Sequence, residues 1–142
     1  MKLTEHFSLE EFVKSPTADK YKIDNTPSYR TQEQLKKLCN EVLEPIRIKY
    51  GKPIKITSGY RCPELNRKIG GARNSDHIFG DAVDFKPVNG SVKELFDLAE
   101  QMVKNKEITC RQLIDEYNYS WVHISINNPW HGYKDNQILH LK

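Results

Sequence analysis

Three stretches of the chain carry apolar residues at helical spacing, and the first lies near the start. Ser8 and Glu11 form a capping-box pattern in front of a short apolar face, which predicts a helix there. Pro16 is expected to end this helix, because proline removes a backbone donor. Residues 14–30 hold few periodic apolar positions and are expected to be irregular coil.

The second and third stretches predict longer helices. Thr31 and Gln34 open the second, and Gly51 stands where a C-terminal cap belongs. Pro45 lies inside this stretch, so the helix is expected to kink or break there. Ser91 starts the third helix, whose expected core face consists of Val92, Leu95, Phe96, Ala99, Met102 and Val103.

Four short segments have the apolar alternation of β-strands. They cover residues 53–58, 82–86, about 112–117 and 121–126. Helices followed by short strands with hairpin-like turns are typical of an α+β domain. The expected fold is therefore a small antiparallel sheet packed against about three helices.

Length and composition describe one globular unit. The 142 residues fit a single domain (1–142) with an N-terminal lead over residues 1–30, and no repeat is visible. Hydrophobic residues make up 37% and charged residues 29%, which argues against a disordered or membrane protein. The net charge of +3 comes from interspersed Lys and Arg, so it does not indicate nucleic-acid binding.

Cysteine usage and the N-terminus bear on location. The odd count of Cys39, Cys62 and Cys110, without a CxxC pair, fits a reducing compartment or free thiols. The first residues lead into polar sequence, so neither a signal peptide nor a membrane-spanning helix is expected. The protein is expected to be made in the cytoplasm. If its substrate lies outside, either another factor must release the protein or a signal has been trimmed.

Strand alternation brings candidate metal ligands together. Asp84 and His123 each lie between apolar neighbours, so both would emerge on the non-core face if their strands share a sheet. His77, in the preceding loop, could reach the same place if Gly80 lets that loop turn back. Two imidazoles and a carboxylate suit zinc, and three protein ligands leave one position for water. Spacing alone does not separate this site from a strand histidine that is simply hydrogen-bonded.

The candidate ligands belong to a longer pattern. It reads Ser75-x-His77-x-x-Gly80-x-Ala82-x-Asp84, followed by Trp121-x-His123. This motif resembles the zinc D-Ala-D-Ala carboxypeptidase and murein endopeptidase family, which shares its metal-site fold with the Hedgehog signalling domain. The segment ITSGYRCP at residues 56–63 is similar to the SGYR segment of that family, and the likeness covers about residues 54–126. Residues 6–12 are similar to small phage-type or prophage-type members.

The resemblance implies a role for each matching position. His77, Asp84 and His123 would hold one zinc ion. Arg61 would pair with a substrate carboxylate or a polarised carbonyl, for which its planar fork of donors is suited. Ser75 would donate to the bound peptide. By residue type alone, Arg61 could equally form a structural salt bridge, and Ser75 could simply cap its loop.

The general base is the point at which the pattern departs from the family. Many members carry an acid three residues before the last histidine, where this chain has Ser120. Glu116 is the preferred base, ahead of its neighbour Asp115, although a solvated hairpin carboxylate is the alternative interpretation. Asp81 and Asp76, inside the zinc loop, are further candidates, with orientation of a ligand imidazole as their other role.

Two aromatic positions are candidates for the substrate groove. Trp121 lies beside the expected metal face, where it could line the cleft or support the His123 ring. His131, between Trp130 and Tyr133, could wall the groove or stabilise a tetrahedral intermediate. Packing of a C-terminal tail is the simpler explanation of that cluster.

The function implied by the resemblance is a zinc peptidase that hydrolyses peptidoglycan stem peptides or cross-links, as endolysins do. The alternative is a non-catalytic zinc module that recognises cell wall or a protein partner, and Ser120 keeps this alternative open. Carboxypeptidase and endopeptidase activity are not separated by the sequence. A domain without metal would require three ligand-type residues to match the family pattern by chance.

Overall fold

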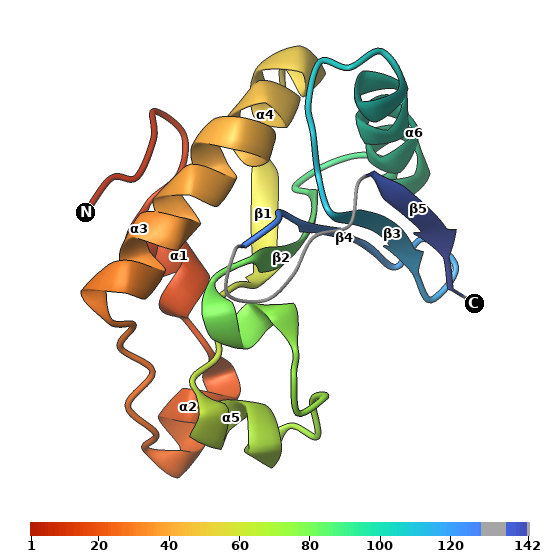
Figure 1. The fold of residues 1–142 in the computed structure, drawn as a ribbon. Helices are drawn as coiled ribbons and strands as arrows, with labels where there is room; N and C mark the ends of the chain where they lie inside the picture. The colour runs from red at the N-terminus through yellow and green to blue at the C-terminus, as the bar shows by residue number, and fades with distance from the viewer. Residues whose placement is uncertain (129–135, 142) are drawn as a thin grey trace.

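A computed structural model describes residues 1–128 and 136–141 of the chain, and a five-stranded sheet forms the centre of the described part (Figure 1). The strand order is β1-β2-β4-β3-β5. The strands are β1 (Ile54–Ser58), β2 (Ala82–Pro87), β3 (Gln112–Glu116), β4 (Trp121–Ser125) and β5 (Gln137–His140).

The sheet confirms the four predicted strands and adds one. Strands β1, β2, β4 and β3 pair antiparallel in that order. Strand β5 pairs parallel with β3 at the sheet edge, which the pattern did not predict. Its four residues are too few for periodicity to show a strand. The α+β class predicted from the sequence is confirmed.

More helical segments are present than the three expected. They are α1 (Leu9–Val13), α2 (Pro16–Tyr21), α3 (Tyr29–Leu38), the π-helical turn η1 (Cys39–Leu43), α4 (Glu44–Tyr50), α5 (Pro63–Lys68), the 3₁₀ turn η2 (Asp76–Phe79) and α6 (Val92–Lys104). No described helix combines the length and the apolar character that crossing a bilayer requires.

The expected coil over residues 14–30 is wrong in part, because α2 lies within it. The Ser15 hydroxyl accepts a hydrogen bond from the Ala18 amide at 3.1 Å, and Pro16 occupies the first turn. The amides of a first helical turn have no intrahelical acceptors, so a proline at this position removes no hydrogen bond from the helix. Pro63 begins α5 in the same way.

The expected kink or break at Pro45 takes the form of a π-helical turn. Helix α3 runs into η1, and the Glu44 amide that closes this turn bonds to the Cys39 carbonyl. Pro45 then falls in the first turn of α4. That helix ends as predicted at Gly51, whose φ of 74° is the left-handed conformation that glycine adopts most easily.

One face of the sheet carries the hydrophobic core. Helix α6 packs on β2, β3 and β4, and α4 packs on α6, so these helices cover that face (Figure 1). Its strand side chains are fully buried: Val83, Phe85, Leu113, Val122 and Ile124. Because strand side chains alternate between faces, Asp84 and His123 emerge on the opposite face.

The N-terminal lead packs against the segment that follows β1. The Phe12 carbonyl accepts a hydrogen bond from the Tyr60 amide at 2.7 Å. The buried Asn25 side chain donates to the carbonyls of Val13 and Tyr60 and accepts from the Cys62 amide. These bonds fix the backbone around Arg61 relative to the sheet.

Candidate metal centre

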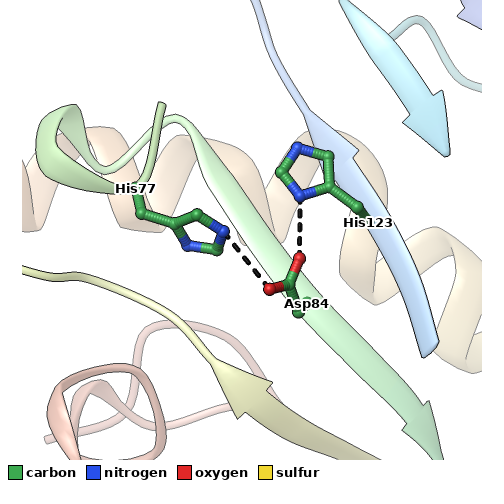
Figure 2. A group of neighbouring side chains, drawn as sticks. All are labelled: His77, Asp84 and His123. Atoms are coloured by element: carbon green, nitrogen blue, oxygen red, sulfur yellow. Dashed lines mark hydrogen bonds and ion pairs between the residues drawn. The ribbon is translucent and has the colours of Figure 1, made fainter. Parts of the chain in front are cut away.

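His77, Asp84 and His123 converge on the face of the sheet that the helices leave open (Figure 2). They come from η2, β2 and β4, and one potential ligand atom from each lies within 4.8 Å of the others. Asp84 and His123 are direct cross-strand partners, as the strand alternation predicted. All three are buried, with exposed fractions of 3%, 9% and 9%.

The Asp84 carboxylate bridges the two imidazoles. Its Oδ1 lies 2.7 Å from His123 Nδ1, and its Oδ2 lies 3.4 Å from His77 Nε2. The two rings are 5.4 Å apart between centroids. The atoms that face one another are therefore Nε2 of His77, the carboxylate of Asp84 and Nδ1 of His123.

A backbone carbonyl orients the His77 ring. His77 Nδ1 lies 2.7 Å from the Gly59 carbonyl oxygen, which can only accept, so Nδ1 carries a proton and Nε2 is the nitrogen that faces the cluster. Metal-bound histidines usually have such a partner on the second nitrogen. A β-carbon at Gly59 would lie 2.5 Å from the Phe12 carbonyl oxygen, so this close approach requires glycine.

The loop that carries His77 turns back at Gly80, as expected. Gly80 ends η2 with a φ of 73°. A β-carbon there would meet Thr31 Cγ2 at 3.0 Å, because α3 packs against the turn. The chain then enters β2 two residues later and reaches Asp84.

Burial and hydrogen bonding act in opposite directions on this cluster. Burial tends to raise the pKa of Asp84, but the hydrogen bonds and charges of His123 and His77 outweigh it and hold that pKa well below its ordinary value. Burial tends to lower the pKa of His123, but its bond to Asp84 and the charges of Asp84, Glu116 and Asp76 raise it. The cluster therefore stabilises an anionic Asp84.

The donor set fits zinc. Zinc favours nitrogen and oxygen ligands in a tetrahedral shell, in which neighbouring ligand atoms lie about 3.4 Å apart. The three ligand atoms lie within 4.8 Å of one another, and zinc binding would replace the 2.7 Å hydrogen bond between His123 and Asp84. The buried side chains already point at one another, and Gly59 fixes the His77 tautomer that ligation requires.

The comparison with known families agrees with this geometry. The sequence model of the peptidase M15 family matches residues 5–125. The chain belongs to the peptidase M15 family. It is the zinc D-Ala-D-Ala carboxypeptidase family that the motif resembles, so its members are zinc-dependent metallopeptidases. The match includes most of the N-terminal lead, beyond the 54–126 segment that the motifs covered. A comparison with curated proteins finds no match.

Arg61 and Ser75 of this M15 peptidase lie together beside His77. Arg61 Nη2 donates to Ser75 Oγ at 3.1 Å, and the Ser75 hydroxyl also accepts from the His77 amide at 3.2 Å. Burial lowers the pKa of Arg61, and the charges of Asp84 and Glu116 oppose that effect. Ser75 thus caps η2, which was the alternative role predicted for it. It also contacts Arg61, the residue predicted to bind the substrate.

Glu116 lies on the metal face of β3, and its carboxylate is anchored by Trp121. The two residues are direct cross-strand partners, and Trp121 Nε1 donates to Glu116 Oε2 at 2.7 Å. His123 lies two residues along β4 on the same face, and diagonal neighbours in such a pair lie about 7–8 Å apart. The other Glu116 oxygen has no hydrogen-bond partner within residues 1–128 and 136–141.

The remaining carboxylates have other contacts. Asp115 is buried on the helix-covered face, where it accepts from the Tyr119 amide and contacts His140, so it lies away from the metal face. Asp81 is fully buried and accepts from the amides of Gln34 and Asn128. Neither Gln34 nor Asn128 belongs to the metal cluster.

Asp76 and Ser120 also make structural contacts within the described chain. Asp76 Oδ1 accepts from Arg111 Nη1 at 2.6 Å, an ion pair that sequence reasoning missed because the partners are far apart in the chain. Ser120 is exposed in the turn between β3 and β4, and its hydroxyl donates to the Tyr117 carbonyl. His131, predicted to wall the groove, lies outside the described residues.

Sequence reasoning also missed Gly59 and Asn25. Gly59 was part of the SGYR segment, but nothing in that pattern showed that its carbonyl would orient a zinc-ligand candidate. Asn25 lies in a segment without periodicity, and its three hydrogen bonds are visible only after folding.

Proposed function

We propose that this chain is a zinc-dependent peptidase that hydrolyses peptide bonds in peptidoglycan, with His77, Asp84 and His123 holding one zinc ion. The observation that carries the proposal is their convergence on one sheet face in a chain of the M15 family. Glu116 is close enough to the cluster for its charge to raise the pKa of His123. Arg61 is close enough for the charge of Asp84 to oppose the lowering of its guanidinium pKa by burial.

The chemistry divides between the metal and the protein. A bound zinc ion would polarise the scissile carbonyl and lower the pKa of a water. Glu116 would take the proton of the attacking water and return it to the leaving amine. The Trp121 indole holds one Glu116 oxygen, so the other is available for this proton. Trp121 would also line the cleft.

Arg61 and Ser75 would bind the peptide. Arg61 Nε is buried and has no hydrogen-bond partner within residues 1–128 and 136–141, while Nη2 is bonded to Ser75. The guanidinium therefore retains donors for an oxygen of the substrate. In a carboxypeptidase, the free C-terminal carboxylate of the substrate would accept two parallel N–H bonds from the guanidinium. In an endopeptidase, a peptide carbonyl oxygen would accept from the guanidinium instead.

The product and the place of action are part of the proposal. The resemblance supports either release of terminal D-Ala or cleavage of cross-links, in the manner of endolysins. The peptidase would be made in the cytoplasm and would act at the bacterial cell wall after release. We place His131 at the substrate groove as the sequence suggests.

A second candidate function is a zinc module that binds cell wall or a protein without hydrolysis. Ser120 favours it, because an exposed serine that bonds to the Tyr117 carbonyl cannot replace the acid that many family members carry there. In this case Glu116 would serve only to anchor Trp121.

Muropeptide mass spectrometry tests both functions. The zinc-loaded protein is incubated with purified cell wall, and the released and remaining muropeptides are compared with a zinc-stripped sample. Release of terminal D-Ala identifies a carboxypeptidase, and loss of cross-linked dimers identifies an endopeptidase. One equivalent of bound zinc with no change in either product class would refute the peptidase and support the binding module.

A further inference from the structure

A pair of lysines extends the metal face along β1 and β2. Lys55 and Lys86 are direct cross-strand partners, and Lys86 lies two residues beyond Asp84 on the same face of β2. At the usual strand rise, the Cα atoms of Asp84 and Lys86 are about 7 Å apart. Both lysines are exposed.

A β-bulge brings the neighbouring part of β1 into line with this face. The pairing shifts between Ile56 and Ser58, so that Ser58 lies opposite Asp84 while Lys55 lies opposite Lys86. Thr57 is the extra residue. Without the bulge, Lys55 and Ser58 would point to opposite faces of the sheet.

Two neighbouring cavities lie between the lysines and the proposed peptide site. A cavity of about 440 Å³ is lined by Lys55, Lys86 and Lys14, together with Glu11. A second cavity of about 170 Å³ also has Lys14 and Thr57 in its wall, and reaches Gly59 and Arg61. Because both cavities have Lys14, Pro16 and Thr57 in their lining, they lie side by side, and a ligand that spans both would reach from Arg61 to Lys86.

The lysine charges at these cavities have no partners in the described part of the chain. The ammonium groups of Lys14, Lys55 and Lys86 form no ion pair, hydrogen bond or cation–π contact within residues 1–128 and 136–141. Glu11 is the acid of the lining, and its carboxylate accepts from the Ser8 amide and hydroxyl. Like charges directly opposite one another destabilise a strand pair, and an anionic ligand would relieve that repulsion.

We infer that Lys14, Lys55 and Lys86 form a cationic subsite that binds a carboxylate carried by the peptide substrate away from its scissile bond. This inference rests on the proposed peptidase function, because it assigns the substrate of that same cleft an acidic segment. Continuity with Arg61 favours a peptide that fills both cavities. A phosphate-bearing wall polymer is the competing occupant.

Binding of two matched peptides tests the subsite. The probes are synthetic stem peptides that differ only in whether a carboxylate within the chain is free or amidated. Affinities are measured on the zinc-loaded protein with Glu116→Gln, which prevents turnover. The free-carboxylate peptide is expected to bind about tenfold more tightly than its amide, and Lys55→Ala/Lys86→Ala to remove that difference by weakening only the free-carboxylate peptide.

The control variant is Lys36→Ala/Lys104→Ala, which removes two exposed charges from α3 and α6 and should keep the tenfold difference. Equal effects of the Lys55/Lys86 change on both peptides would overturn the subsite. Lysine-dependent binding of soluble poly(glycerol phosphate), without discrimination between the peptides, would overturn it in favour of the polymer. Lysine-dependent discrimination without cleavage of either peptide by the zinc-loaded wild type would support the subsite and refute the peptidase.

Discussion

Two sets of polar side chains share one face of the sheet but are held in different ways. His77, Asp84 and His123 contact one another, and the central carboxylate bonds to both imidazoles. Glu116 and Arg61 are instead held from outside the cluster, by Trp121 and Ser75, and each keeps polar atoms without a partner in the described chain. The first arrangement suits an ion, and the second suits a substrate. Metal binding and catalysis should therefore be separable by mutation.

The largest effect is expected from Asp84→Asn. The amide keeps the shape of the carboxylate but removes the charge that draws both imidazoles and a cation together. We expect zinc affinity to fall by more than about 100-fold and activity to be lost with it. Chelator competition and metal analysis measure the affinity.

Asp115→Asn is the matched control for Asp84→Asn, because Asp115 lies in the same sheet, on β3 beyond β4, but faces the helices. It should lower the melting temperature and leave zinc affinity unchanged. A full equivalent of tightly bound zinc in Asp84→Asn would remove Asp84 from the ligand set.

Glu116→Gln should separate the two sets cleanly. Glutamine can still accept from the Trp121 indole but cannot take a proton, so kcat should fall by about 10²–10⁴-fold while zinc remains bound. Ser120→Ala serves as the control and should change kcat little, because its hydroxyl bonds only within the turn. Full activity of the zinc-loaded Glu116→Gln protein would show that the base is another group.

Gly59→Ala probes the contact between the lead and the metal cluster. Its β-carbon would collide with the Phe12 carbonyl, so the Gly59 carbonyl that orients His77 must move. Zinc affinity should fall by about 10–100-fold, as for other second-shell changes. Chelator competition measures it, with Gly51→Ala as a control for backbone strain without a collision, because the φ of 74° disfavours alanine but no atom lies within 4 Å of the added β-carbon. Unchanged affinity would show that the carbonyl is dispensable.

The smallest effect is expected from pH on the zinc-free protein. The depressed pKa of Asp84 stabilises the fold above its unfolded value near 4 and loses that effect in acid, whereas the raised pKa of His123 stabilises it below about 6.5 and loses that effect as pH rises. The free energy of unfolding should therefore decrease between pH 6 and 9. Each kcal/mol of this decrease should lower the melting temperature by about 2–4 °C.

Asp84→Asn should flatten this pH dependence, because it removes the charge that raises the pKa of His123. Zinc should stabilise more strongly at high pH, since it requires neutral imidazoles. Calorimetry with and without zinc measures both trends. A decline of equal size in Asp84→Asn would assign the effect to another group.

The strands and the pairing of Asp84 with His123 could be predicted from the sequence. Each residue is flanked by apolar side chains that must face the core, so the alternation alone fixes the face on which it emerges. Helix ends at Ser91 and Gly51 were predicted for an equally local reason, because a cap depends on only a few neighbouring residues.

The rest depends on contacts between distant segments. The bulge at Thr57 leaves no mark in the local pattern, yet it decides which β1 side chains share the face with Asp84. The first helix ends before Pro16 as predicted, but Pro16 also begins α2, because proline in a first helical turn costs no hydrogen bond. Asn25 gains its importance only when Tyr60 and Cys62 come within reach.

The pairing of Glu116 with Trp121 has a consequence for how related chains are aligned. Loop tips gain and lose residues readily, whereas flanking strands keep their register. Counting a fixed number of positions back from the final histidine leads to Ser120, in the turn. Following the register instead leads to Glu116, opposite the aromatic residue two positions before that histidine. An alignment that gives Glu116 the role proposed above therefore places its gaps at residues 117–120.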